Sequence, residues 1–208
     1  MHQTPLQAPP PITVVLEQLL TTEKHITIGE IVDRIDERAF GLLMLIVGLP
    51  TFIPVLPFGS PIVGSLYMLL ALRLIIGMDR PWLPGFVRNK ALAPQTVDTL
   101  RRRGLPLVRR LERFSRPRFP VLNSPVAVRA AAIVVFLMGL ILLSPAPFLN
   151  TLPAVAVMLI GLGLLNDDGI FVLTGMVLGV VAVGILVATV GLLVEVAQRL
   201  FPWWVRPR

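Results

Sequence analysis

The residues of this chain that could do chemistry are a few polar side chains inside or beside long apolar stretches. Arg73 stands in an apolar run from Ala39 to Met78 that contains no other charge. A charge at membrane depth is a candidate functional site by default. An arginine near a helix end can instead extend its charged head to the membrane surface, so both interpretations of Arg73 remain open.

Four more polar residues complete the set of candidate transport or binding residues. Asn150 and Thr151 follow a proline-containing break, and Asp167 and Asp168 belong to the segment NDDG. The first pair could cap a half-helix that faces a solute, or cap a helix in an external turn. The two carboxylates could bind a cation or relay protons, or lie in a solvated turn.

The sequence lacks the patterns on which most catalytic sites depend. It contains no phosphate-binding glycine loop, no dinucleotide-binding motif and no metal-ligand spacing of His, Asp or Glu. Both histidines, His2 and His25, precede the apolar stretches, and there is no cysteine for a disulfide or a thiolate ligand. A glycosyltransferase would need a soluble nucleotide-sugar domain, for which no segment fits. We therefore expect no enzyme and no cofactor.

The elements that carry these residues are strongly apolar. Of 208 residues, 55% are hydrophobic and only 15% are charged, and the mean hydropathy is +0.80; soluble domains carry about 25% charged residues. Residues 130–166 and 169–194 contain no charge. A transmembrane helix needs about 20 apolar residues. The pattern predicts an all-α, polytopic membrane protein with two proline-broken helical hairpins and a C-terminal transmembrane helix.

Prolines interrupt both hairpins. A proline inside a helix removes a hydrogen bond and costs about 3 kcal/mol, and in hydrocarbon a broken helix is tolerated only where it is buried or lines a cavity. The breaks are therefore either re-entrant segments or external turns. The candidate break residues are Pro50, Pro54 and Pro57 in the first hairpin and Pro147 and Pro153 in the second.

The two hairpins share a sequence pattern that predicts an internal repeat. Dipeptides match at an offset of 90 residues, or of 91 for the last pair: Pro57-Phe58 with Pro147-Phe148, Met68-Leu69 with Met158-Leu159, and Gly48-Leu49 with Gly139-Leu140. Paired breaks at corresponding positions of two halves indicate a binding site in transporter folds. The sense of the repeat, parallel or inverted, is left open.

The segment between the hairpins, 79–125, is basic, with eleven Lys/Arg against three acids. Leucine and arginine alternate in it as in an amphipathic helix, and each basic residue near an anionic membrane surface contributes about 1 kcal/mol. An excess of positive charge in a short loop indicates the cytoplasmic side. Because the cluster lies between apolar blocks, we expect lipid headgroups rather than nucleic acid as its partner. The expected lipid-facing residues are Arg101, Arg102, Arg103, Arg109 and Arg110.

The chain divides into five segments: a flexible or amphipathic N-terminal segment (1–25), an interfacial helix with the first hairpin (26–78), the basic segment (79–125), the second hairpin with the last helix (126–198) and a tail (199–208). Thr27 and Glu30 have the spacing of a capping box, which predicts a helix start. Gly175, Gly179 and Gly184 predict close helix packing, either internal or in a homodimer.

Several motifs together resemble one family. The stretches TIGEIVDRIDERAFG, RPWLP, RRLERFSRPRFP and PFLNTLPAVAVMLIGLGLLNDDG are similar to those of the ExoD-type exopolysaccharide synthesis family, over about residues 26–190. The resemblance implies a multi-pass protein of the bacterial inner membrane, linked to exopolysaccharide production and alkali tolerance, without implying enzyme chemistry. Glu37 and Arg38 match the acid–base pair before the family's glycine, which implies an ion pair where the chain enters the membrane.

Two functional hypotheses follow from the sequence. The first is a small transporter or channel for an ion or solute, built around the paired breaks. The second is a non-transporting membrane scaffold or regulator, whose basic segment recruits polysaccharide-synthesis partners or anionic lipid.

Overall fold

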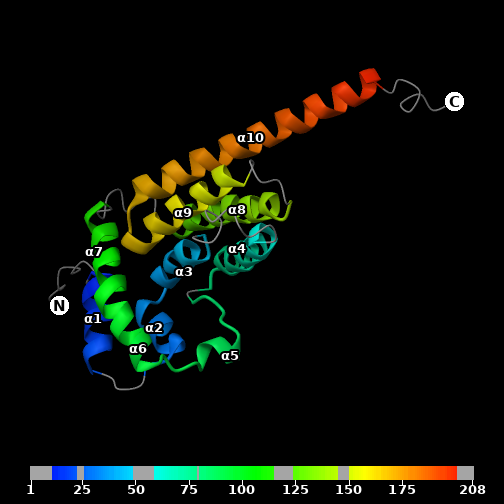
Figure 1. Cartoon of the computed structure of the whole chain (residues 1–208). Coiled ribbons are helices and arrows are strands. Elements are labelled where there is room, and N and C mark those ends of the chain that lie inside the picture. Colours follow the sequence, from blue (N-terminus) through cyan, green and yellow to red (C-terminus); the bar gives the residue numbers. More distant parts are fainter. Residues whose placement is uncertain are drawn as a thin grey trace.

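The computed structural model describes residues 11–22, 26–48, 59–78, 80–114, 124–144 and 150–200. These residues form an all-α structure, as predicted (Figure 1). An isolated β-bridge pairs Thr27 with Ala91.

Five apolar helices form a bundle. They are α3 (Arg38–Gly48), α4 (Gly59–Ile76), α8 (Pro125–Leu142), α9 (Thr151–Asn166) and α10 (Gly169–Leu200). Their shared core includes Phe40, Met44, Tyr67, Val135 and Ile160, each fully buried. These side chains fill the space between the helices and stabilise the bundle through van der Waals contacts.

Small residues let the bundle helices approach closely. A Cβ atom on Gly64 of α4 would lie 2.5 Å from the carbonyl oxygen of Gly139 in α8. Gly41 of α3 meets Gly161 of α9 in the same way. Helix α4 therefore packs on α8 and α3 packs on α9, with backbones in contact, as small residues permit in membrane helices.

A smaller helical unit covers one end of the bundle (Figure 1). Its elements are α1 (Ile12–Thr22), α2 (Ile28–Ile35), α5 (Gly85–Arg88), α6 (Pro94–Thr99), a π-helical turn η2 (Leu100–Gly104) and α7 (Leu105–Phe114). Leu16 and Leu20 of α1 share an apolar core with Val32 of α2 and with Leu105 and Val108 of α7. The N-terminal and basic segments thus fold together.

The start of α2 is capped as the sequence predicts. The Thr27 hydroxyl accepts from the Glu30 backbone N–H at 3.2 Å, and the Glu30 carboxylate accepts from the Thr27 N–H at 2.8 Å. This reciprocal capping box satisfies two N–H groups that the first turn of a helix leaves unpaired.

By length and composition, two of the described helices could cross a membrane: α8, with 18 residues, and α10, with 32. Three more bundle helices have apolar stretches of fewer than 18 residues: Arg38–Gly48 in α3, Ser60–Ile76 in α4 and Thr151–Asn166 in α9. The prolines Pro50, Pro54, Pro57 and Pro147 lie outside the described residues. Pro153 lies in the first turn of α9, where a missing N–H removes no intrahelical hydrogen bond.

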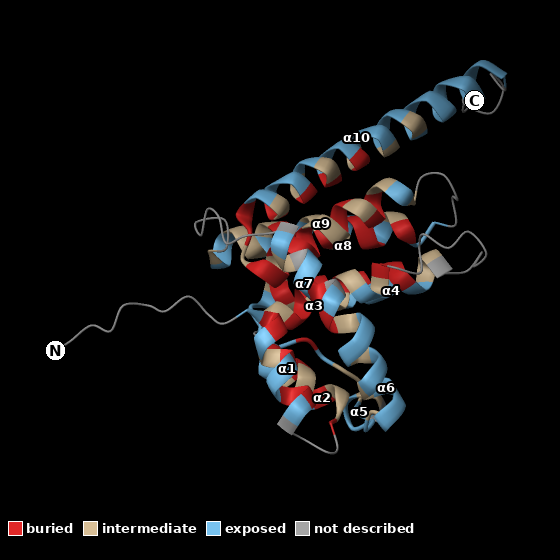
Figure 2. Ribbon diagram, turned by 60° about the vertical axis from the view of Figure 1, so that its left-hand side comes forward, coloured by how far each residue is buried: buried red, intermediate tan, exposed pale blue. Residues whose placement is uncertain are grey.

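Helix α10 is packed only along its first half. Gly175 meets α9 at Ile160, Gly179 meets α8 at Val134, and Ala182 is the last buried residue. None of residues 183–200 is buried, and a Cβ on Gly184 would have nothing within 4 Å (Figure 2). Of the three glycines predicted to pack, Gly175 and Gly179 do so within the chain.

Candidate functional site

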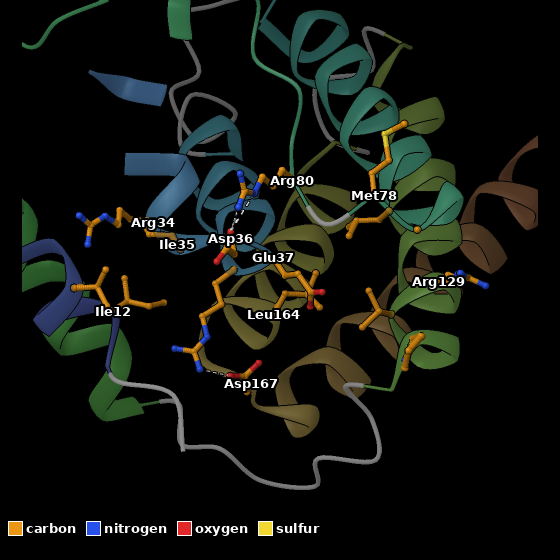
Figure 3. A pocket seen from close by; sticks show the side chains of 16 residues that line it. Ile12, Arg34, Ile35, Asp36, Glu37, Met78, Arg80, Arg129, Leu164 and Asp167 are labelled. Carbon is orange, nitrogen blue, oxygen red and sulfur yellow. Dashed lines mark hydrogen bonds and ion pairs between the residues drawn. The ribbon is translucent and has the colours of Figure 1, made fainter. Parts of the chain in front are cut away.

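A pocket of about 890 Å³ lies at the end of the bundle that the smaller unit covers (Figure 3). Helices α3 and α8 begin there, and α4 and α9 end there. Apolar side chains such as Leu74 and Leu164 form part of its wall. Its charged residues are Arg34, Asp36, Glu37, Arg38, Arg80, Arg129 and Asp167, four cations against three anions.

An ion pair joins α3 to α9 at this pocket. Arg38, the first residue of α3, donates from Nη2 to the Asp167 carboxylate, which follows the last residue of α9. The Arg38 side chain is 19% exposed and that of Asp167 is 38% exposed. Asp167 has a backbone φ of 53°, a left-handed conformation that ends the helix and that Asp adopts more readily than most residues.

The neighbouring carboxylate, Asp168, makes a local hydrogen bond at the start of α10. Asp168 is only 2% exposed, and its Oδ1 accepts from the backbone N–H of Ile170 at 3.1 Å. Asp168 is therefore the N-cap of α10. A negative charge at this position also interacts favourably with the positive N-terminal end of the helix dipole. The NDDG segment is therefore a turn in which Asp167 holds α3 and Asp168 starts α10.

Two more acids on the α2 side of the pocket bind arginines from the segment after α4. Arg80 lies 3.0 Å from an Asp36 oxygen and 3.8 Å from an Asp33 oxygen, and Arg88 lies 2.8 Å from Asp33. All four side chains are at least one-third exposed, and such pairs contribute about 0–1 kcal/mol each. The Arg80 pairs join α2 to the segment that follows α4 at the pocket, whereas the Arg88–Asp33 pair lies within the smaller unit.

The two hairpins make corresponding contacts. A Cβ on Gly48 of α3 would lie 2.9 Å from Met158 Cγ of α9, and a Cβ on Gly139 of α8 would lie 2.8 Å from Met68 Cγ of α4. These pairs are related by the sequence offsets of 91 for α3 and α8 and of 90 for α4 and α9. An approximate two-fold relation therefore exchanges the hairpins. Because α3 and α8 both begin at the pocket, the repeat is parallel.

The pocket is built from corresponding residues of both hairpins. At the same two offsets Arg38 corresponds to Arg129 and Asp167 to Gly77, and all four line the pocket. Asp167 and Gly77 both have positive φ, 53° and 81°. A Cβ on Gly77 would lie 2.9 Å from Nη2 of Arg129. The first position thus holds an arginine–carboxylate pair, and the second holds the arginine beside a glycine.

Comparison with known proteins identifies the family. A family model described as "Exopolysaccharide synthesis, ExoD" matches residues 12–188, which include every residue that lines the pocket. The chain belongs to the ExoD family.

Two curated relatives are similar to the chain over most of its length, and the name of one agrees with this assignment. The chain is 34% identical over 156 residues to an uncharacterized protein of Synechocystis sp. (strain ATCC 27184 / PCC 6803 / Kazusa), covering 74% of this chain and 73% of that one. It is 32% identical over 155 residues to Protein ExoD of Rhizobium meliloti (strain 1021), covering 72% of this chain and 64% of that protein, less than two thirds. No solved structure matches.

Three other residues singled out in this ExoD-family sequence do not line the pocket, although Arg73 contacts Met78, which does. Arg73 is in the last turn of α4, with Nη2 2.8 Å from the Met78 sulfur and Nε buried without a hydrogen-bond partner among the described residues. Asn150 stands at the N-cap of α9 but makes no capping bond, and Thr151 beside it is exposed. Both lie at the end of α9 opposite the pocket.

All five basic residues expected to face lipid are exposed, and two of them also contact α1. Arg101 donates to the Leu20 carbonyl at 2.6 Å, and Arg109 lies 3.5 Å from a Glu17 oxygen. At the other end of α1, Glu112 accepts from the Thr13 N–H at 2.9 Å. Glu112 thus places a negative charge at the N-terminus of α1, and Arg101 places a positive charge at its C-terminus. Both charges interact favourably with the helix dipole. Arg102, Arg103 and Arg110 are exposed.

Sequence reasoning missed three arginines of the pocket: Arg34, Arg80 and Arg129. A signal for Arg129 was present, because the offset that pairs Gly48 with Gly139 also pairs Arg38 with Arg129. Arg34 and Arg80 reach the pocket from the smaller unit, and no sequence pattern links that unit to the hairpin ends. Glu37 lines the same pocket as Arg38, and an ion pair between these two stays a prediction.

Proposed function

We propose that this ExoD-family chain is a multi-pass protein of the bacterial inner membrane that moves a small ion or solute in support of exopolysaccharide synthesis and alkali tolerance. The observation that carries the proposal is the charged pocket at which both hairpins meet. Corresponding segments of two repeats form the binding site in many transporter folds. The apolar helices α8 and α10 support a membrane location.

Ion and proton flux in proteoliposomes tests this proposal. The wild-type chain is compared with Asp167→Asn, which removes a charge from the pocket, and with Thr151→Ala, which changes an exposed residue at the opposite end of α9. We expect flux above that of empty liposomes, lowered by Asp167→Asn and unchanged by Thr151→Ala. Absence of flux under every imposed gradient, with the protein folded, would contradict transport.

A scaffold that recruits partners or anionic lipid is the second candidate. It is favoured by Arg102, Arg103 and Arg110, which are exposed on a folded unit beside the bundle and pair with no described residue. A complementation series under alkaline stress separates the two functions. A scaffold requires these three arginines and tolerates Asp167→Asn, whereas a transporter shows the reverse.

A further inference from the structure

The two hairpins place an arginine at the same point of the pocket but give it different neighbours. Arg38 begins α3, and Arg129 lies in the second turn of α8. Each lies beside the residue that ends the facing helix in a left-handed conformation: Asp167 after α9 and Gly77 after α4. Figure 3 shows Asp167 and Arg129 on different sides of the pocket.

Arg38 has its carboxylate within the chain, whereas Arg129 does not. Among the residues that the structure describes, none forms an ion pair or a hydrogen bond with the Arg129 side chain. The glycine is the reason, because the position that supplies a carboxylate to Arg38 supplies only a hydrogen atom to Arg129. The guanidinium lies so close to Gly77 that a side chain there would touch it.

The remaining charges of the pocket also favour an anion. Arg38 is paired with Asp167, and Arg80 with Asp36. Of the seven charged residues, this leaves two arginines, Arg34 and Arg129, against the single carboxylate of Glu37. Arg34, Arg129 and Glu37 are all exposed, so the cationic excess of the pocket is accessible to an anion from solution, beside a wall that is partly apolar.

We propose that Arg129 binds an external oxyanion, a carboxylate or phosphate group, in the place that the Asp167 carboxylate takes beside Arg38. A guanidinium presents a planar fork of donors that matches both groups and forms short, charge-assisted hydrogen bonds with them. The oxyanion belongs either to a free solute or to the headgroup of an anionic amphiphile whose apolar part lies against the pocket wall. This inference names a ligand class for the proposed transport pocket.

Direct binding to the purified full chain tests the site without any gradient. Isothermal titration is carried out with inorganic phosphate and, separately, with dihexanoyl phosphatidic acid; dihexanoylglycerol, which lacks the phosphate, is the control. We expect phosphate-dependent binding that Arg129→Gln weakens by about tenfold or more, since a charge-assisted hydrogen bond is lost. Arg110→Gln, which removes an exposed arginine outside the pocket, should leave the affinity unchanged.

A second pair of variants tests the geometry. Gly77→Asp supplies the missing carboxylate, so it should pair with Arg129 and lower the affinity for phosphate about as much as Arg129→Gln does. Gly77→Asn has nearly the same size and the same backbone strain at positive φ, but no charge, and should retain binding to within about threefold, which is less than 1 kcal/mol.

The outcomes separate the possibilities. Binding of phosphate alone indicates a free solute, and binding of phosphatidic acid without phosphate indicates a headgroup. The proposal is wrong if neither probe binds, if Arg129→Gln binds as the wild type does, or if Gly77→Asp and Gly77→Asn behave alike. Flux with no oxyanion binding would overturn this inference and leave transport standing, whereas binding with no flux would do the opposite.

Discussion

At the scale of single residues, the Arg38–Asp167 pair is the contact that holds the first hairpin to the second at the pocket. Its partners are 129 residues apart in sequence, and the arginine is largely buried. A charge-assisted hydrogen bond in such a setting stabilises by about 1.5–3 kcal/mol. The pair is therefore strong enough to fix how α3 and α9 meet.

A double-mutant cycle measures this contribution. Arg38→Gln and Asp167→Asn should each lower the free energy of unfolding by about 1–3 kcal/mol, because each leaves the other charge without its partner. The double variant should lose less than the sum of the two. Unfolding in detergent, followed by circular dichroism, provides the values. Strict additivity would mean that the pair contributes nothing to stability.

Asp168 allows a separate prediction about the start of α10. Asp168→Ala removes the acceptor of the Ile170 N–H and should lower the free energy of unfolding by about 1 kcal/mol. Asp168→Asn keeps a capping oxygen and is the matched control, with a smaller loss. The same unfolding measurement applies. Equal losses in the two variants would assign the effect to charge rather than to capping.

At the scale of elements, the close approach of α4 and α8 depends on glycine. Gly64→Ala places a methyl group 2.5 Å from the Gly139 carbonyl oxygen, so the helices must separate. Overpacking of this kind costs about 1–3 kcal/mol. The methyl group of Gly184→Ala would have no atom within 4 Å. This variant should be more stable by about 1 kcal/mol, because alanine has the higher helix propensity. Thermal unfolding of both variants should shift in opposite directions; a stable Gly64→Ala variant would contradict the packing.

Some elements of this architecture could be predicted from the sequence, and others could not. Local signals were sufficient for the helical class, for the capping box at Thr27 and Glu30, and for the turn at Asp167 and Asp168. They were insufficient for the pocket, because the residues that line it are up to 155 positions apart, from Ile12 to Asp167, a range that capping and periodicity do not reach. The repeat was the one long-range signal, and followed to the hairpin ends it also reaches Arg129.

The basic segment illustrates a second limit of sequence. Alternating leucine and arginine in residues 100–113 indicates an amphipathic helix, but not what covers its apolar face. The structure packs that face on α1 through Leu105 and Val108. A membrane surface and a neighbouring helix both bury the same apolar stripe, so the pattern alone does not choose between them.

At the scale of the whole molecule, the helices have unequal lengths. With a rise of about 1.5 Å per residue, the 18 residues of α8 extend about 27 Å and the 32 residues of α10 about 48 Å. The hydrocarbon core of a bilayer is about 30 Å thick. Residues 183–200 project from the bundle with large apolar side chains exposed. If α10 crosses a bilayer, we expect tilt of the helix or association with a second copy to cover part of them.

The last prediction concerns the sides of the membrane on which the two ends of the bundle lie. Helix α8 is long enough to cross, and the cationic excess of the smaller unit predicts that this unit lies on the cytoplasmic side. If α8 crosses, Arg110 and Thr151 lie on opposite faces of the membrane, because Arg110 belongs to the smaller unit and Thr151 to the far end of α9. The chain has no cysteine, so a single introduced thiol can be labelled without background.

In intact cells an impermeant maleimide should label Thr151→Cys and spare Arg110→Cys, and both should react after the membrane is opened. The charged pocket then faces the cytoplasm, and a solute bound there must still pass between the two hairpins to reach the other side. Protection of Thr151→Cys in intact cells would mean that the hairpins are re-entrant. In that case the far ends of α8 and α9 stop inside the bilayer, short of the opposite surface.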